Sequence, residues 1–75
     1  MKREALLRVL KRAPLAYDVL GDSKGSHLQL RSPNGYKPLT FAFHPGTELG
    51  PIMVKKVLCG GVGLTPQEAM RILRG

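Results

Sequence analysis

The chain has little of what secreted, membrane-spanning and base-stacking proteins need. It contains one cysteine, Cys59, no tryptophan and only four aromatic residues among 75 positions. A lone cysteine excludes an internal disulfide framework, which favours the reducing cytoplasm as the location. No apolar run approaches the ~18 residues of a membrane span. Arg8 interrupts the run from Leu6 to Leu10, so this segment does not match a signal peptide.

Acidic residues are also scarce. Five Asp and Glu residues stand against twelve Lys and Arg residues, which gives a formal net charge of +7. This charge predicts an anionic partner, which can be nucleic acid, an acidic protein or an anionic membrane. A basic surface that serves only solubility is the simpler alternative. A chain this short is expected to form a single domain, residues 1–75, with a thin core and a shallow, extended site.

The spacing of apolar residues predicts an α+β protein. Leu6, Val9 and Leu10 repeat at helical spacing, and Pro14 ends that helix. Turn-forming residues separate three short strands, and a proline at the first helical position marks each of two later helices. The expected elements are helix 2–12, strands 16–20, 27–31 and 37–44, and helices 51–58 and 66–74. This α-β-β-β-α-α order favours a three-stranded antiparallel sheet with helices on one face.

The C-terminal part carries two further signals. The run Gly60-Gly61-Val62-Gly63 is expected to end the preceding helix at residue 58, because glycine is a poor helix former. Thr65 and Glu68 have the spacing of a capping box at the start of the last helix. That helix is expected to bury Ala69, Ile72 and Leu73.

The two longer strands predict one apolar and one polar face of the sheet. Leu28 and Leu30 point to the core from the first of them. Leu39, Phe41 and Phe43 do so from the second, after a turn at Ser32-Pro33-Asn34-Gly35. The other face is expected to carry His27, Gln29, Arg31, Thr40, Ala42 and His44.

His27 is the candidate for chemistry. It follows Gly25 and Ser26 at the start of a strand, beside a loop whose glycines let the backbone approach another molecule closely. A histidine exchanges a proton near neutral pH, and a basic protein brings it close to a polyanion. We therefore expect His27 to act as a general acid or base in the cleavage of RNA. The simpler alternative is an exposed strand histidine without a catalytic role.

Other polar residues can support this histidine. Lys24, Arg31 and the backbone N–H groups of residues 21–26 can stabilise phosphate charge. Ser26 can donate a hydrogen bond to phosphate, or it can simply form the turn. His44 shares the polar face and can supply a second proton transfer, or it can only stabilise the turn that follows it.

Neither a metal centre nor a serine or cysteine nucleophile is expected. Cys59, His27 and His44 lack the spacing of metal ligands and are too few for a closed zinc site. No acidic residue accompanies an obvious histidine pair, and Cys59 is expected to be a buried thiol at a helix end. We therefore expect no metal and no small-molecule cofactor.

Several motifs occur in a recognisable order along nearly the whole chain. They are Lys2-Arg3-Glu4 in a basic first helix, Lys24-Gly25-Ser26-His27, Pro33-Asn34-Gly35, His44, Glu48-Leu49 with Pro51, and Gly63-Leu64-Thr65 before the last helix. In this order they resemble the HicA toxin family of bacterial toxin–antitoxin systems. The resemblance implies a fold similar to double-stranded RNA-binding domains, metal-independent cleavage of mRNA, and a HicB-like antitoxin as partner. It also implies that His27 is the catalytic residue.

The residues expected to contact RNA are Lys24, Gly25, Gln29, Arg31 and Lys37. Double-stranded RNA is read through its shape and phosphates, which suits a surface without aromatic stacking platforms. Two alternatives to a ribonuclease stay open. The first is a non-catalytic RNA-binding module of the same fold, and the second is a protein whose positive charge binds an acidic protein.

Overall fold

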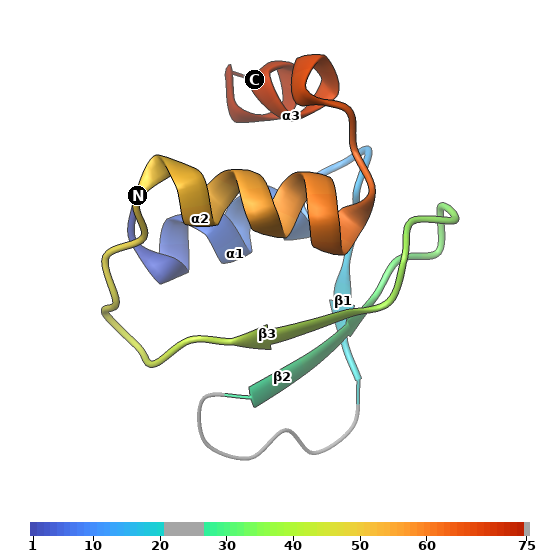
Figure 1. Ribbon diagram of the computed structural model, residues 1–75. Helices are drawn as coiled ribbons and strands as arrows, with labels where there is room; N and C mark the ends of the chain where they lie inside the picture. Colours follow the sequence, from blue (N-terminus) through green and yellow to red (C-terminus); the bar gives the residue numbers. More distant parts are fainter. Residues whose placement is uncertain (21–26, 75) are drawn as a thin grey trace.

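A computed structural model of the protein describes residues 1–20 and 27–74 (Figure 1). Its elements are α1 (Arg3–Lys11), β1 (Asp18–Val19), β2 (His27–Arg31), β3 (Leu39–Ala42), α2 (Pro51–Lys55), η1 (Lys56–Val62) and α3 (Pro66–Arg74). The predicted α+β class is confirmed: three antiparallel strands form one sheet, and the helices lie on one side of it (Figure 1). This is the arrangement of a double-stranded RNA-binding domain.

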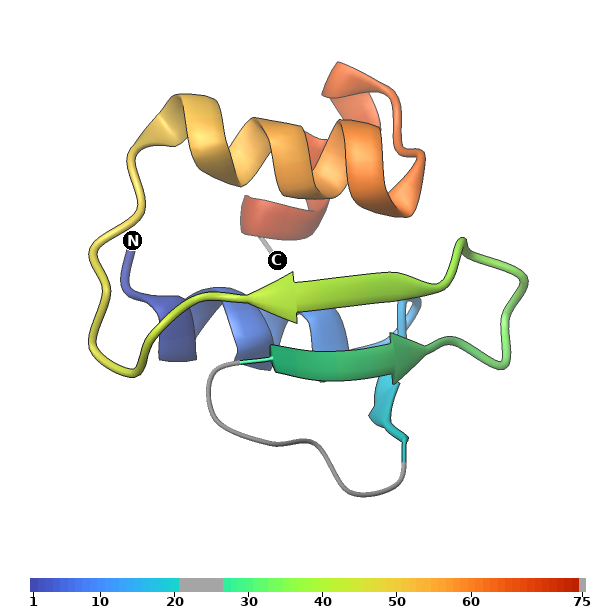
Figure 2. The ribbon, with the colours of Figure 1, turned by 60° about the horizontal axis from the view of Figure 1, so that its bottom comes forward.

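Two strands are shorter than expected at both ends, since β1 covers only Asp18–Val19 of the expected 16–20 and β3 only Leu39–Ala42 of the expected 37–44. The strands have the order β1-β2-β3, and β2 and β3 run side by side in opposite directions (Figure 2). β1 lacks the first two residues of the expected strand 16–20, because Ala16 has a left-handed backbone with a φ of 51°. β3 ends at Ala42, because the chain turns where the N–H of Thr47 donates to the carbonyl of His44.

The core lies between the inner face of the sheet and the helices α1 and α2. α1 buries Leu6, Val9 and Leu10, as its spacing predicts. Removing a leucine side chain fully from water contributes roughly 1.5–3 kcal/mol. Tyr17 is also buried, and its hydroxyl donates a 2.6 Å hydrogen bond to the carbonyl oxygen of Lys37. The hydrogen bond removes the cost of burying that hydroxyl.

The expected break at residue 58 is wrong. The helical backbone continues from α2 through η1, which is wound as a π-helix and ends only at Val62. Gly61 packs against the sheet there, since a Cβ atom at this position would lie 2.6 Å from Cδ1 of Leu39. Gly63 then ends the helix with a φ of 93°, a left-handed conformation that glycine adopts without strain.

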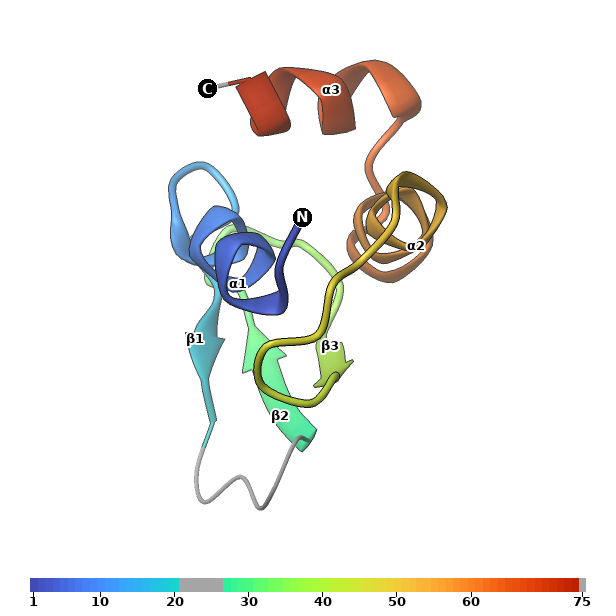
Figure 3. The ribbon, with the colours of Figure 1, turned by 90° about the vertical axis from the view of Figure 1, so that its left-hand side faces the viewer.

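α3 forms an outer layer beyond α1 and α2, away from the sheet (Figure 3). Its predicted capping box is confirmed: the N–H of Glu68 donates to Oγ1 of Thr65, and the N–H of Thr65 donates to Oε1 of Glu68. Ala69 is buried as expected, but Leu73 is 38% exposed. The expected burial of Leu73 is wrong because α3 packs on η1 and does not reach the sheet.

Candidate active site on the outer face of the sheet

β2 presents its polar residues on the side of the sheet that faces away from the helices. His27, Gln29 and Arg31 are exposed, whereas Leu28 is half-buried and Leu30 is buried. The two-residue period of a strand produces this alternation. The predicted facing of these side chains is therefore confirmed, and we call this surface the outer sheet face.

The register of the sheet gives each of these residues a neighbour. His27 is paired with Ala42 and Gln29 with Thr40, whose hydroxyl lies 3.2 Å from Oε1 of Gln29. Arg31 is paired with Asp18 of β1. Directly paired residues project from the same face, so a carboxylate stands opposite the one Lys or Arg in the three strands. This position of Asp18 was not predicted from the sequence.

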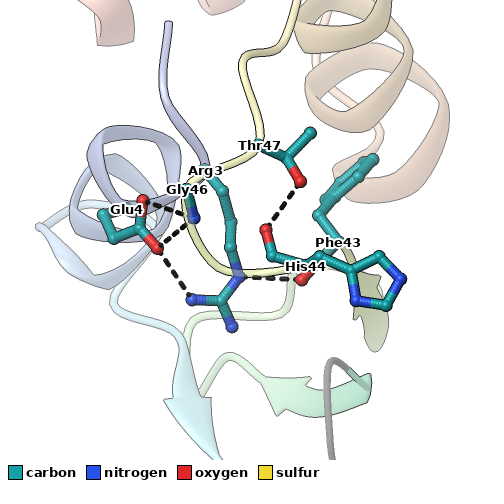
Figure 4. Close-up of polar contacts among 6 residues, drawn as sticks. All are labelled: Arg3, Glu4, Phe43, His44, Gly46 and Thr47. Carbon is teal, nitrogen blue, oxygen red and sulfur yellow. Dashed lines mark hydrogen bonds and ion pairs between the residues drawn. The ribbon is translucent and has the colours of Figure 1, made fainter.

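His44 lies at the same end of the hairpin as His27. It is exposed and follows Ala42, the partner of His27, by two residues. The hydroxyl of Thr47 donates to the carbonyl oxygen of His44 at 2.7 Å (Figure 4). The N–H of Thr47 donates to the same oxygen at 3.1 Å. Hydrogen bonds between residues of the turn itself therefore hold the backbone at His44.

Helix α1 also fastens this turn, through Arg3. Its side chain is largely buried, and its Nε donates a 2.9 Å hydrogen bond to the carbonyl of Phe43 (Figure 4). Its guanidinium lies 5.5 Å from the ring centre of Phe41. This role of Arg3 was not predicted from the sequence. The signal was spacing, since Arg3 precedes Leu6 by three residues and Leu10 by seven and so falls on the buried stripe of the helix.

Glu4 makes a second connection from α1 to the turn. Its carboxylate accepts the N–H of Gly46 at 3.0 Å and lies 3.4 Å from Nη1 of Arg3 (Figure 4). The hydrogen bond from the Gly46 backbone, more than the neighbouring guanidinium, lowers the pKa of Glu4 from its ordinary value. The ionised carboxylate of Glu4 therefore stabilises the turn that carries His44.

Lys37 lies at the other end of the hairpin. Its aliphatic chain approaches the end of η1, where a Cβ atom at Gly63 would lie 3.5 Å from Cε of Lys37. The four steps along β2 from His27 to Arg31 span roughly 13 Å at the usual rise of a strand. Lys37 is thus separated from His27 by the length of the strand, so the structure does not bring these two predicted site residues together.

Three of the predicted site residues, Lys24, Gly25 and Ser26, lie outside the described residues. Within residues 1–20 and 27–74, no three His, Cys, Asp or Glu side chains gather where they could hold a metal ion. Cys59 is half-buried on η1. No helix in the same part of the chain is long and apolar enough to cross a membrane.

The described cations gather on the helices. Arg31 is exposed on the outer sheet face, but Asp18 stands opposite it. The helical side carries the exposed residues Lys2, Arg8, Lys11, Arg12, Lys55, Lys56, Arg71 and Arg74. The net charge therefore does not concentrate beside His27 within the described residues.

Fold and site together define a small α+β domain whose arrangement is similar to that of double-stranded RNA-binding domains, with an exposed histidine on its sheet. A comparison with protein families matches residues 3–59 to the model described as the HicA toxin of bacterial toxin–antitoxin systems. The match covers more than half of the 75 residues, and the chain belongs to the HicA toxin family. Comparisons with curated proteins and with solved structures returned no match.

Membership in this family supplies the coarse function. The chain is a toxin of a toxin–antitoxin system, and the family is one of toxin ribonucleases. An RNA substrate and a HicB-type antitoxin partner follow from the same membership. The matched range includes α1, the sheet and the start of η1, but it ends before α3.

Proposed function

We propose that this toxin is an endoribonuclease that cleaves mRNA without a metal ion, with His27 as general acid or base. The observation that carries the proposal is the exposure of His27 on the outer sheet face, within the segment that matches the toxin family. An RNA strand reaches this face without meeting a helix. The proposed place of action is the cytoplasm, where mRNA is available and a HicB-like antitoxin restrains the enzyme.

The reaction requires two proton transfers. A base takes the proton of the ribose 2′-hydroxyl while its oxygen forms a bond to the adjacent phosphorus. The bond from phosphorus to the 5′-oxygen then breaks, an acid protonates that oxygen, and a 2′,3′-cyclic phosphate remains. A positioned acid or base accelerates such a step by about 10²–10⁴-fold. His27 performs one transfer in this proposal, and His44, at the same end of the hairpin, is the candidate for the other.

Further residues hold the RNA in the proposed complex. Gln29 and Arg31 continue the exposed row from His27 along β2. Lys24, Gly25 and Ser26 precede the histidine in sequence, and we assign them to contacts with the phosphate beside the cleaved bond. Lys37, beyond the far end of the strand, contacts RNA away from the reacting atoms. Asp18 stands opposite Arg31 and offsets its charge. In this proposal, hydrogen bonds and shape therefore contribute more to the binding of RNA on the outer sheet face than long-range electrostatic attraction does.

The test is cleavage of a labelled RNA by the purified protein in the presence of a chelator. We expect cleavage by the parent, products that end in a 2′,3′-cyclic phosphate, and no cleavage of DNA of the same sequence, which lacks the 2′-hydroxyl. His27→Ala should reduce the rate by about 10²-fold or more while RNA retardation on a gel persists. Arg8→Ala, on the helical side, serves as a control that should retain the rate.

Two outcomes would overturn the proposal. Full activity of a folded His27→Ala variant would remove the histidine from the mechanism. If the parent instead retards RNA in a salt-sensitive manner and leaves it intact, the chain is a binding module of this fold. Circular dichroism of each variant separates loss of chemistry from loss of fold.

A further inference from the structure

An apolar groove of about 430 Å³ lies on the helical side, between α2 and α3. Its floor and walls include Leu49, Val54, Leu58, Ala69, Met70 and Leu73. Lys55 provides the one charged side chain in its lining, and the N-terminal ammonium of Met1, which also lines the groove, is paired with Glu48 at 2.6 Å. Met70 and Leu73 are 56% and 38% exposed, although both are large apolar side chains. Apolar surface gathered in a concave site is typical of protein recognition.

Basic side chains border this groove. Met70 also lines a neighbouring depression together with Arg71 and Arg74. Leu73 lines another one on the side of α1, together with Arg8, Lys11 and Arg12. The helical side also holds Glu68, but this carboxylate is engaged in the capping box with Thr65. The groove therefore combines an apolar centre with a cationic rim.

We infer that the groove binds an acidic amphipathic helix of a partner protein. Apolar side chains of that helix would fill the groove, and its carboxylates would meet the rim. A second copy of this chain is a poor occupant, because each copy has a net charge of +7. The lining comes mainly from helices whose backbone groups are already paired, so an added strand would find no partner for its N–H and C=O groups, whereas a helix pairs its own.

This inference rests on the proposed function in one respect: the chain is a toxin that a partner restrains, so the antitoxin is the protein expected to carry the helix. The groove is remote from the proposed chemistry, since α3 lies on the far side of α1 and α2 from the sheet (Figure 3). α3 also lies outside the segment that matches the family model. Binding in the groove would anchor the partner without itself blocking His27.

The probe is a fluorescein-labelled peptide of about four helical turns, with leucines along one face and glutamates elsewhere. A control peptide has the same composition, but its leucines are distributed around the helix. We expect the amphipathic peptide to bind at least about tenfold more tightly than the control in fluorescence anisotropy. Added salt should weaken the binding, because the rim contacts are exposed ion pairs.

Two substitutions locate the binding site. Met70→Glu places a carboxylate in the groove, and Ile52→Glu places the same charge on a side chain that is 76% exposed and does not line the groove. Met70→Glu should weaken the peptide by at least about tenfold, and Ile52→Glu by less than about twofold. Met70→Gln, which adds no charge, should lie between them. Thermal unfolding confirms that each variant is folded.

Three results would overturn the inference. The first is equal binding of the two peptides, and the second is an equal loss of affinity in the Met70→Glu and Ile52→Glu variants. The third is a loss of binding of a short RNA duplex in the Met70→Glu variant, which would make the groove an RNA-binding surface. Cleavage assays keep the two proposals apart: Met70→Glu should still cleave RNA, and His27→Ala should still bind the peptide.

Discussion

The two sides of this molecule differ in how they use charge. Within the described residues, the strands contribute one cation to the outer sheet face, and Asp18 stands opposite it. The helical side holds eight exposed cations in the three helices, their caps and η1. Yet the proposed chemistry lies on the sheet, where His27 is exposed. Net charge therefore indicates what kind of partner a small protein binds, but it does not locate the reacting groups.

The two sides also differ in how their side chains are held. On the sheet, the backbone ladder fixes the direction of each residue, and α1 ties down the adjacent turn through Arg3 and Glu4. On the helical side, α3 is joined to the rest through η1 and leaves Met70 and Leu73 exposed. An ordered polar face suits a reaction that needs fixed geometry, whereas an incompletely covered apolar face suits a partner.

The largest effect on the cleavage rate is expected when His27 and His44 are each replaced by glutamine in separate variants. His27→Gln should reduce the cleavage rate by about 10²–10⁴-fold, and His44→Gln should reduce it by a smaller factor if His44 only assists the second proton transfer. Initial rates on one labelled RNA provide the comparison. A greater loss in the His44→Gln variant would move the principal catalytic role from β2 to the turn after β3.

The next effect tests whether the two sides fold together. Gly61→Ala adds a Cβ atom that would lie 2.6 Å from Cδ1 of Leu39, so the buried side chain of Leu39, η1 or β3 must shift. We expect a loss of about 1–3 kcal/mol in the free energy of unfolding, measured by denaturant titration. Gly60→Ala is the control, because nothing lies within 4 Å of its added Cβ atom. Equal stability of the two variants would contradict the close packing of η1 on the sheet.

Much of the architecture could be predicted because it depends on local periodicity. The two-residue alternation of β2 and the helical spacing of Leu6, Val9 and Leu10 each identify a buried face without knowledge of the rest of the chain. The capping box of α3 is equally local. The family resemblance then added the expectation of a fold similar to double-stranded RNA-binding domains, which periodicity alone does not define.

The errors occurred where distant contacts override local preference. Gly60 and Gly61 disfavour a helix, but packing of Gly61 against Leu39 stabilises η1. Leu73 has the spacing of a buried residue, yet it lies on a helix that does not reach the sheet. Arg3 is charged and still buried, because Phe43 and Phe41 provide a carbonyl and a ring for its guanidinium. None of these partners is close in sequence.

A smaller effect, on the stability of α3, should change peptide binding on the helical side without changing RNA cleavage on the sheet. Thr65→Ala removes the oxygen that accepts the N–H of Glu68, and loss of such a cap costs about 1 kcal/mol. We expect a lower unfolding midpoint and several-fold weaker binding of the amphipathic peptide, with RNA cleavage retained. Thr40→Ala, on the outer sheet face, should leave peptide binding intact. A parallel loss of both activities in the Thr65→Ala variant would show that the groove and the sheet are coupled.

The smallest effect concerns the connection between α1 and the turn that carries His44. The pKa of Glu4 is lowered first by the hydrogen bond from the Gly46 backbone, so the carboxylate binds a proton less readily in the folded chain than in the unfolded one. The resulting stability is present above the ordinary pKa of a glutamate and is lost as the pH falls through the lowered value. Acid should therefore weaken this connection.

Glu4→Gln isolates that contribution, because a glutamine oxygen still accepts the N–H of Gly46 but carries no charge. The parent should be more stable than the variant at neutral pH, and the difference should vanish as the pH falls below the lowered pKa of Glu4. The amide signal of Gly46 in NMR should titrate with Glu4 in the parent and stay constant in the variant. Because the pKa values of Glu48 and Glu68 are also lowered, the variant retains the rest of the acid dependence. An unchanged gap between the two proteins across this range would mean that the charge of Glu4 does not stabilise the turn, and that Arg3 and Thr47 hold His44 in place without it.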